Sequence, residues 1–160
     1  MMREDLSLLP ATAADADAIR ALTRDAYAKW VPVIGREPLP MRADYAAAVR
    51  EHRIDLLRLE GRLVALIQMI PKPDHLLIEN VAVAPGFQGR GLGRMLLAHA
   101  ERVAAALGHA EVRLYTNKAF AENLRLYLAF GYRVDREDAF MGGLTAVSYT
   151  HLTLPTNREV

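Results

Sequence analysis

Hydrophobic positions recur along the chain with two different spacings, and the spacing predicts which segments are helices and which are strands. Spacings of three and four residues predict four helices, at 12–27, 41–52, 94–107 and 119–130. Alternating or continuous apolar runs predict strands at 4–9, 54–60, 62–70, 75–83, 111–116 and 132–136, followed by a last strand. This order of elements predicts an α/β protein with a mixed layer arrangement.

Several boundaries carry their own signals. Thr12 is expected to cap the first helix, with Asp15 and Asp17 favourable in the first turn because a helix N-terminus is electropositive. Glu60-Gly61 between two strands is a hairpin signal. Three prolines in the segment 30–40 predict irregular backbone there.

The most informative segment is the glycine-rich turn Gln88-Gly89-Arg90-Gly91-Leu92-Gly93, which lies between a predicted strand and a predicted helix. Unpartnered backbone N–H groups and the helix dipole make such a turn a phosphate site, and glycines let the backbone approach the anion closely. Two common phosphate loops are excluded by spacing. The pattern G-x-G-x-x-G requires a glycine at Arg94, and G-x-x-x-x-G-K-[ST] requires Lys and Ser or Thr at Leu92 and Gly93.

The remaining pattern, Q-x-x-G-x-G, resembles the pyrophosphate loop of the Gcn5-related N-acetyltransferase (GNAT) family, which binds the diphosphate of acetyl-coenzyme A. A later string, Asn123-Leu124-Arg125-Leu126-Tyr127 followed by Gly131-Tyr132, is similar to that family's N-x-x-x-Y…G-[FY] motif. The order of elements also resembles GNAT proteins to about residue 146. The resemblance implies a GNAT (acyl-CoA N-acyltransferase) fold, with a mixed, mostly antiparallel sheet flanked by about four helices, in one domain at 1–146.

The resemblance implies an N-acetyltransferase that moves an acetyl group from acetyl-CoA to a primary amine by direct attack, without a metal. It places the coenzyme on the side chains or backbone of Val81, Ala82, Val83, Gln88, Gly89, Arg90, Gly91, Leu92, Gly93, Arg94 and Asn123. Among these, the backbone of 81–83 is implied to pair with the pantetheine amides and to polarise the thioester carbonyl. Arg90 and Arg94 either add charge at the phosphates or are simply solvated.

Two residues are predicted to handle protons. Asn123 and Tyr127 are four residues apart and share one helix face. The resemblance implies that Tyr127 protonates the departing thiolate, a role that suits a phenol. Glu79 is the candidate base for the amine, and its alternative is a strand residue that holds an arginine.

Acceptor recognition is implied for the first third of the chain. Tyr27 and Trp30 are the candidate substrate-binding residues, beside the segment 31–41. The alternative is that both only fasten this segment to the core. Glu37 is a candidate for attracting a cationic amine.

Composition narrows the class of protein. The chain has no cysteine, which excludes disulfides, thiolate metal sites and a cysteine nucleophile. A net charge of +1 gives no argument for nucleic acid binding, and no apolar run is long enough for a membrane span. The five histidines lack metal-ligand spacing. We expect a cytoplasmic monomer or homodimer acting on a small-molecule or peptide amine, with a non-catalytic acyl-CoA-binding regulatory module as the alternative.

The last part of the chain differs from the rest. Residues 147–156 closely resemble the translation of a transposon-type sequencing-library adapter. We therefore expect a non-native tail at 147–160 and draw no functional inference from residues after Ala146. The segment from Ala146 to Leu154 alternates and is β-prone, so we expect that it can occupy the place of the last strand.

Overall fold

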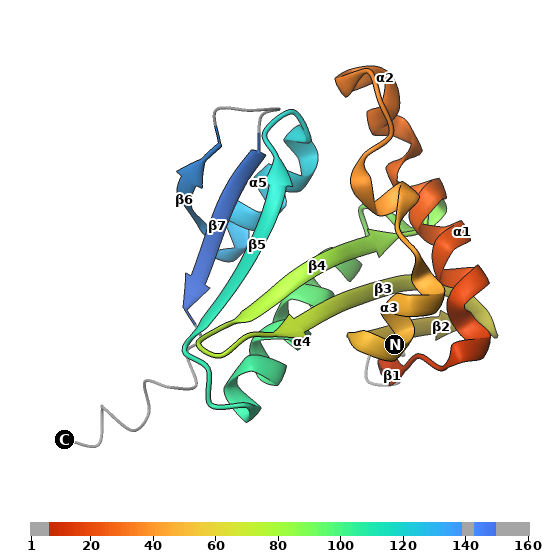
Figure 1. Cartoon of the computed structure of the whole chain (residues 1–160). Helices are drawn as coiled ribbons and strands as arrows, with labels where there is room; N and C mark the ends of the chain where they lie inside the picture. Colours follow the sequence, from red (N-terminus) through yellow and green to blue (C-terminus); the bar gives the residue numbers. More distant parts are fainter. Residues whose placement is uncertain (1–6, 139–142, 150–160) are drawn as a thin grey trace. The chain divides into compact units, whose positions relative to one another are not determined.

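The computed structural model describes residues 7–138 and 143–149 (Figure 1). Within these residues, seven strands form one mixed sheet in the order β1-β2-β3-β4-β5-β7-β6. The strands are β1 (Leu9–Pro10), β2 (Arg53–Leu59), β3 (Arg62–Pro71), β4 (Leu76–Val83), β5 (Glu111–Asn117), β6 (Arg133–Glu137) and β7 (Gly143–Tyr149). The α-helices are α1 (Ala16–Tyr27), the one-turn α2 (Val31–Ile34), α3 (Tyr45–Glu51), α4 (Leu92–Ala106) and α5 (Ala121–Phe130). The predicted α/β class, with a mixed sheet and four longer helices, is confirmed.

The described residues divide into two compact units. The N-terminal unit comprises residues up to 68 together with 80–93, and the C-terminal unit comprises 69–79 together with the residues from 94 onward.

The core of the N-terminal unit follows the predicted pattern. Ile19, Leu22 and Ala26 of α1 are buried at helical spacing. Within this unit, strand β3 is buried continuously from Val64 to Gln68, as expected for a strand covered on both faces. Each fully buried aliphatic side chain contributes roughly 1.5–3 kcal/mol relative to an exposed one.

The predicted hairpin has the geometry of a tight turn. Glu60 and Gly61 have φ values of 52° and 80°, so both central residues adopt the left-handed conformation that a two-residue hairpin of this kind requires. Glycine adopts it without strain, and Glu60 is the only described non-glycine residue with positive φ.

The first helix begins with a network around Thr12. The Thr12 backbone N–H donates to the Asp15 carboxylate at 2.8 Å, and Arg58 from β2 donates to the other carboxylate oxygen at 2.7 Å. The Thr12 hydrogen bond, and next to it Arg58, lowers the pKa of Asp15 despite some desolvation. The chain makes a 3-10 turn at Ala13–Asp15 before α1.

Two expectations for the segment 28–52 were wrong. The segment 30–40 is only partly irregular, because 3-10 segments at Ala28–Trp30 and Leu39–Arg42 and the helix α2 occupy most of it and only 35–38 lie outside them. Pro32 is tolerated in the first turn of α2, where a backbone N–H has no helical acceptor in any case. The helix expected from Met41 begins only at Tyr45, since Asp44 caps it by accepting from the Ala47 backbone N–H at 3.1 Å.

The C-terminal unit is built on β5. Strand β4 pairs with β5 in parallel from Leu76 to Ile78, and β7 pairs antiparallel with β5 and with β6. Helix α4 buries Leu96, Leu97, Ala100 and Ala104 along one stripe. Helix α5 ends at Gly131, whose φ of 116° is a conformation that favours glycine.

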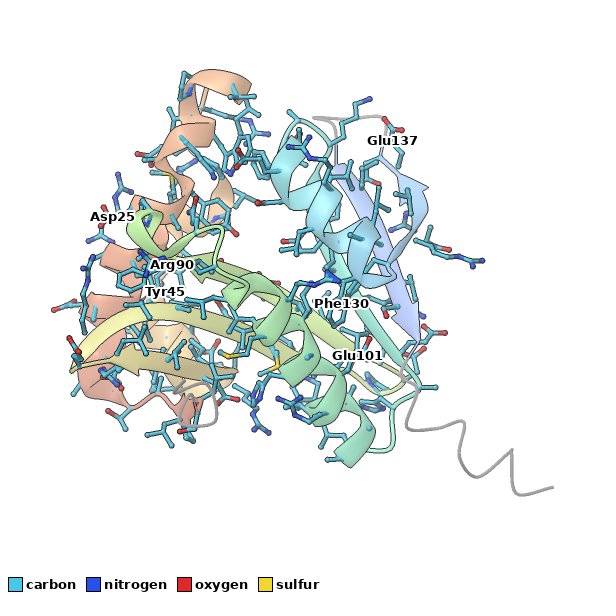
Figure 2. All side chains as sticks on the ribbon, turned by 180° about the vertical axis from the view of Figure 1, so that it is seen from behind. Asp25, Tyr45, Arg90, Glu101, Phe130 and Glu137 are labelled. Atoms are coloured by element: carbon cyan, nitrogen blue, oxygen red, sulfur yellow. The ribbon has the colours of Figure 1, made fainter. Side chains whose placement is uncertain are left out.

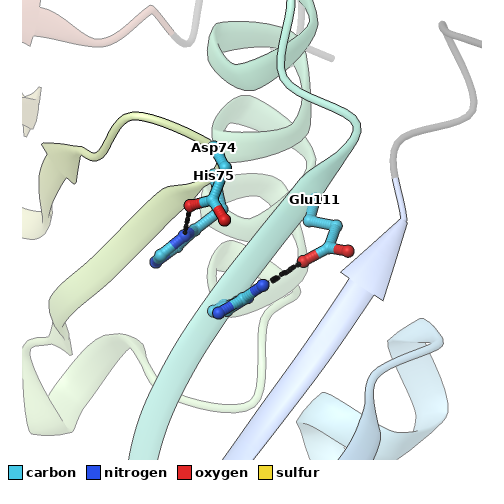
Figure 3. Close-up of polar contacts among 4 residues, drawn as sticks. Asp74, His75 and Glu111 are labelled. Carbon is cyan, nitrogen blue, oxygen red and sulfur yellow. Dashed lines mark hydrogen bonds and ion pairs between the residues drawn. The ribbon is translucent and has the colours of Figure 1, made fainter.

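Two local ion pairs lie near the beginning of β4 and β5 (Figure 3). Asp74 pairs with His75 at 2.7 Å, and Glu111 pairs with Arg113 at 2.7 Å. The hydrogen bond from His75 lowers the pKa of the Asp74 carboxyl. Ion pairs with this much solvent exposure contribute little to folding.

The adapter-like segment begins inside β7. Residues 147–149 continue the ladder, with Val147 opposite Arg113 on β5 and Arg133 on β6. Backbone pairing of this kind accepts most β-prone sequences. The part of the expected strand beyond residue 149 lies outside the described residues.

Candidate active site

The glycine-rich loop has a backbone suited to an anion. It follows β4 through the 3-10 turn Pro85–Phe87, and α4 begins at Leu92, two residues before the predicted start. Gly89 and Gly91 have φ values of 80° and 84°, whereas Arg90 between them does not have positive φ. Such alternation turns successive N–H groups toward one point, forming a concave anion site. The N–H groups of residues 89–91 have no hydrogen-bond acceptor among the described residues.

The Gln88 side chain braces this loop. Its Nε2 donates to the Val83 carbonyl at 2.9 Å, and its Oε1 accepts from Lys29 Nζ at 2.9 Å. The loop is thereby fastened to the end of β4 and to the segment after α1. Lys29 brings a positive charge to the loop from 59 positions away in the chain. Nothing in the local sequence indicated that contact.

Strand β4 presents two different faces. Ile78, Asn80 and Ala82 are buried, whereas Glu79 is exposed and Val81 and Val83 are half-buried. The alternation places the Glu79, Val81 and Val83 side chains together on one face. Beyond Ile78, no residue of β4 is paired with β5 within the described chain. Within 81–83, the Val81 carbonyl accepts from the Tyr27 hydroxyl at 3.4 Å, and the Val83 carbonyl accepts from Gln88.

Glu79 makes no ion pair among the described residues. The alternative reading, a strand carboxylate that holds an arginine, therefore finds no support there. Glu79 is exposed, so its carboxylate is accessible from solvent.

Asn80 is the centre of a buried hydrogen-bond network that the sequence did not indicate. Its Oδ1 accepts from the Tyr27 hydroxyl at 3.0 Å, and its Nδ2 donates to Thr23 and Tyr45 at 3.2 Å each. The Tyr45 hydroxyl also donates to the Pro40 carbonyl at 2.7 Å (Tyr45 is labelled in Figure 2). Asn80 is 3% exposed, so these bonds are shielded from competing water.

Tyr127 has a buried ring and a hydroxyl without a hydrogen-bond partner among the described residues. The residue is 7% exposed. Desolvation raises the pKa of Tyr127 to about 12, so the phenol carries its proton at neutral pH. Asn123, one turn earlier on α5, is half-buried. The Tyr132 ring centroid lies 6.0 Å from that of Tyr127.

The predicted phosphate-binding arginines lie over aromatic rings. The Arg90 guanidinium carbon lies 5.1 Å from the Phe87 ring centroid, and that of Arg94 lies 5.7 Å from the Phe130 centroid. Arg62, which the sequence did not single out, lies 5.2 Å from the same Phe87 ring. Figure 2 shows Arg90 on the loop that precedes α4.

The candidate acceptor residues lie mostly in the core. Tyr27 and Trp30 are 9% and 7% exposed, and the Tyr27 hydroxyl already donates to Asn80. These contacts favour the alternative in which both residues fasten the segment to the core. The Glu37 carboxylate pairs with Arg24 at 2.8 Å, and this contact lowers the pKa of Glu37. Its charge is compensated, which weakens the expectation that it attracts a cationic amine.

The described residues contain neither a candidate metal site nor a helix that could span a membrane. No cluster of His, Asp and Glu there has the arrangement of a metal site. No helix of the described chain has the length and apolarity needed to cross a bilayer.

Comparison with known proteins shows the family. Residues 17–132 match the family described as "Acetyltransferase (GNAT) family". Since this span is well over half of the chain, the protein belongs to the GNAT acetyltransferases. No curated protein matches the sequence at a significant level.

Solved structures share the fold at low sequence identity. The PaiA N-acetyltransferase from Thermoplasma acidophilum, in complex with coenzyme A, is 14% identical with a TM-score of 0.81, over 90% of this chain and 98% of that chain. A GNAT family acetyltransferase from Elizabethkingia anophelis with acetyl-CoA bound is 16% identical, with a TM-score of 0.70, over 92% of this chain and 99% of that chain. The ribosomal-protein-S18-alanine N-acetyltransferase from Escherichia coli is 18% identical, with a TM-score of 0.68, over 91% of this chain and 94% of that chain. The predicted GNAT fold is thus confirmed.

Proposed function

We propose that this protein is an N-acetyltransferase that moves the acetyl group of acetyl-CoA to a primary amine. The observation that carries the proposal is the backbone of the loop at 88–91. The N–H groups of Gly89, Arg90 and Gly91 have no acceptor among the described residues, and both glycines have positive φ. The chain that carries this loop belongs to the GNAT family. Diphosphate is the natural ligand of such a loop at a helix N-terminus.

Different residues of the chain bind different parts of the acetyl donor. Bound acetyl-CoA supplies the acetyl group as a thioester. The N–H groups of Gly89, Arg90 and Gly91 donate to its diphosphate, while the first turn of α4, at Leu92, Gly93 and Arg94, adds a positive dipole end. The backbone of 81–83 pairs with the pantetheine amides, and the Asn123 amide hydrogen-bonds the same arm.

Glu79 and Tyr127 manage the protons of the transfer. Glu79 accepts a proton from the acceptor ammonium, which frees the nitrogen lone pair for attack on the thioester carbonyl carbon. A C–N bond forms and the C–S bond breaks. Tyr127 gives its proton to the departing sulfur. The second nitrogen proton leaves to solvent, Glu79 releases its proton to solvent, and the tyrosinate takes up one proton from solvent. The products are the amide and free CoA thiol.

Burial of Tyr127 affects both partners of its proton transfer. A phenol with a pKa near 12 is a weaker acid than a thiol, whose ordinary pKa is about 8.5. The same apolar surroundings also disfavour a thiolate, so they raise the basicity of the departing sulfur. The difference between the two pKa values is therefore smaller than the ordinary thiol value implies, which makes the transfer less unfavourable.

Two glycine-to-alanine variants, one in the loop and one in the turn before it, test the proposed donor site. In Gly91→Ala the new Cβ meets no atom within 4 Å, but the φ of 84° is strained for alanine. Strain of about 1–2 kcal/mol predicts a five- to thirtyfold weaker acetyl-CoA affinity by calorimetry. Gly86→Ala is the matched control, because its surroundings are equally open and its φ is not positive. Equal affinities for both variants and the parent protein would overturn the proposed donor site.

Acetyl transfer itself is tested by CoA-thiol release with a panel of amines. The panel contains a polyamine, free amino acids, an aminoglycoside-type antibiotic and a peptide with N-terminal alanine, the last because one structural neighbour is named for such an acceptor. Thiol release that depends on one class of amine supports the proposal. Tight acetyl-CoA binding without turnover on any amine favours the non-catalytic regulatory module instead.

A further inference from the structure

Two arginines contact the ring of Phe87, which precedes the loop. Arg62, the first residue of β3, and Arg90 of the loop both place their guanidinium carbons just over 5 Å from its ring centroid. All three residues belong to the N-terminal unit. Neither guanidinium has a carboxylate or other hydrogen-bond partner among the described residues.

This arrangement contrasts with other arginines of the same unit. Arg24, Arg53 and Arg58 each pair with a carboxylate, at 2.8, 3.0 and 2.7 Å. A cation over an aromatic ring gains little stabilisation, and the ring does not neutralise the charge. The guanidiniums of Arg62 and Arg90 therefore lack a counter-charge, and an external anion would supply it.

The loop and the arginine pair suit different anionic groups. The backbone N–H groups of 89–91 match a diphosphate, whereas two planar guanidiniums match the oxygens of a separate phosphomonoester. A phosphomonoester carries about −1.5 to −2 charges at neutral pH, so it can balance both arginines. Coenzyme A contains both groups, with the monoester on its ribose 3′ oxygen.

We propose that Arg62 and Arg90, positioned by Phe87, bind the 3′-phosphate of coenzyme A and make the protein selective for the 3′-phosphorylated donor. The inference rests on the proposed function, since it concerns the same donor. It goes further by assigning Arg62, from the β2–β3 hairpin, to recognition of the donor's nucleotide end.

The test compares the affinity for acetyl-CoA with that for acetyl-3′-dephospho-CoA. The parent protein is expected to bind acetyl-CoA roughly tenfold more tightly. Arg62→Gln is expected to lose most of this preference, by weakening acetyl-CoA binding while leaving the dephospho compound unchanged. Arg62→Lys keeps the charge without the planar fork, so an intermediate preference is expected.

Arg50→Gln is the matched control for a lost positive charge. Arg50 is an exposed arginine of the same unit, and it donates only to the Ala46 carbonyl of its own helix, at 3.0 Å. This variant should keep the full preference. The inference is overturned if the parent protein binds acetyl-CoA and acetyl-3′-dephospho-CoA with equal affinity. It is also overturned if Arg62→Gln weakens the binding of both compounds equally. Either result leaves the proposed function standing. Failure of the parent protein to bind either compound overturns the proposed function itself.

Discussion

At the residue scale, the Tyr127 side chain has the properties of a proton donor. Its ring is buried, its hydroxyl has no partner among the described residues, and its pKa is raised to about 12. We predict that Tyr127→Phe lowers kcat by about 100-fold or more, because general acids typically contribute a factor of that size. Acetyl-CoA affinity, measured by calorimetry, should stay unchanged because the aromatic ring is kept.

Tyr132→Phe is the matched control for the Tyr127 substitution. Tyr132 is on the same unit, 2% exposed, and its buried hydroxyl also has no partner among the described residues. Removing that hydroxyl leaves a ring of the same shape and relieves an unsatisfied polar group, so fold and turnover should be kept. If the two variants turn over acetyl-CoA at the same rate as the parent protein, Tyr127 is not the acid.

At the element scale, one asparagine links two helices and a strand. Asn80 of β4 bonds to Thr23 and Tyr27 of α1 and to Tyr45 of α3, all within the N-terminal unit. We predict that Asn80→Ala lowers the free energy of unfolding by about 2–4 kcal/mol, because several buried polar groups lose a partner together. Urea unfolding followed by circular dichroism measures this change.

Thr23→Val is the companion variant for Asn80. It removes a single hydrogen bond to Asn80 and keeps the shape of the side chain, so a loss of only about 1 kcal/mol is expected. Equal losses in the two variants would contradict a cooperative network around Asn80.

Elements set by local pattern were predictable from sequence, and elements set by tertiary contacts were not. The hairpin at Glu60-Gly61 and the alternation of β5 depend on residues that are neighbours in the chain. The segment 30–40 contains three prolines, so the sequence predicted irregular backbone there. Its short helices are fixed by contacts that no local pattern contains, such as Arg24 donating to the Met41 carbonyl at 2.8 Å.

The same distinction applies to the candidate site on the scale of the whole molecule. The loop glycines and Tyr127 were found from sequence because their motifs lie within a few consecutive residues. Lys29, Arg62 and Asn80 were missed because each acts through partners 25 to 59 positions away. The buried setting of Tyr27 also required the structure, since an aromatic residue before a proline-rich segment suits either a substrate contact or a core anchor.

Stability in acid is a property of the whole molecule, because carboxylates with lowered pKa occur in both units. Hydrogen bonds from Thr12, Arg24 and His75 lower the pKa values of Asp15, Glu37 and Asp74, respectively. A carboxyl whose pKa is lower in the folded state stabilises the fold above its unfolded pKa of about 4, and this contribution is lost as pH falls through the folded value. We therefore predict a urea midpoint that is constant above about pH 5 and falls below pH 4. Asp74→Asn and Glu37→Gln should each reduce the difference between pH 6 and pH 3, whereas a midpoint that does not change from pH 6 to pH 3 contradicts the prediction.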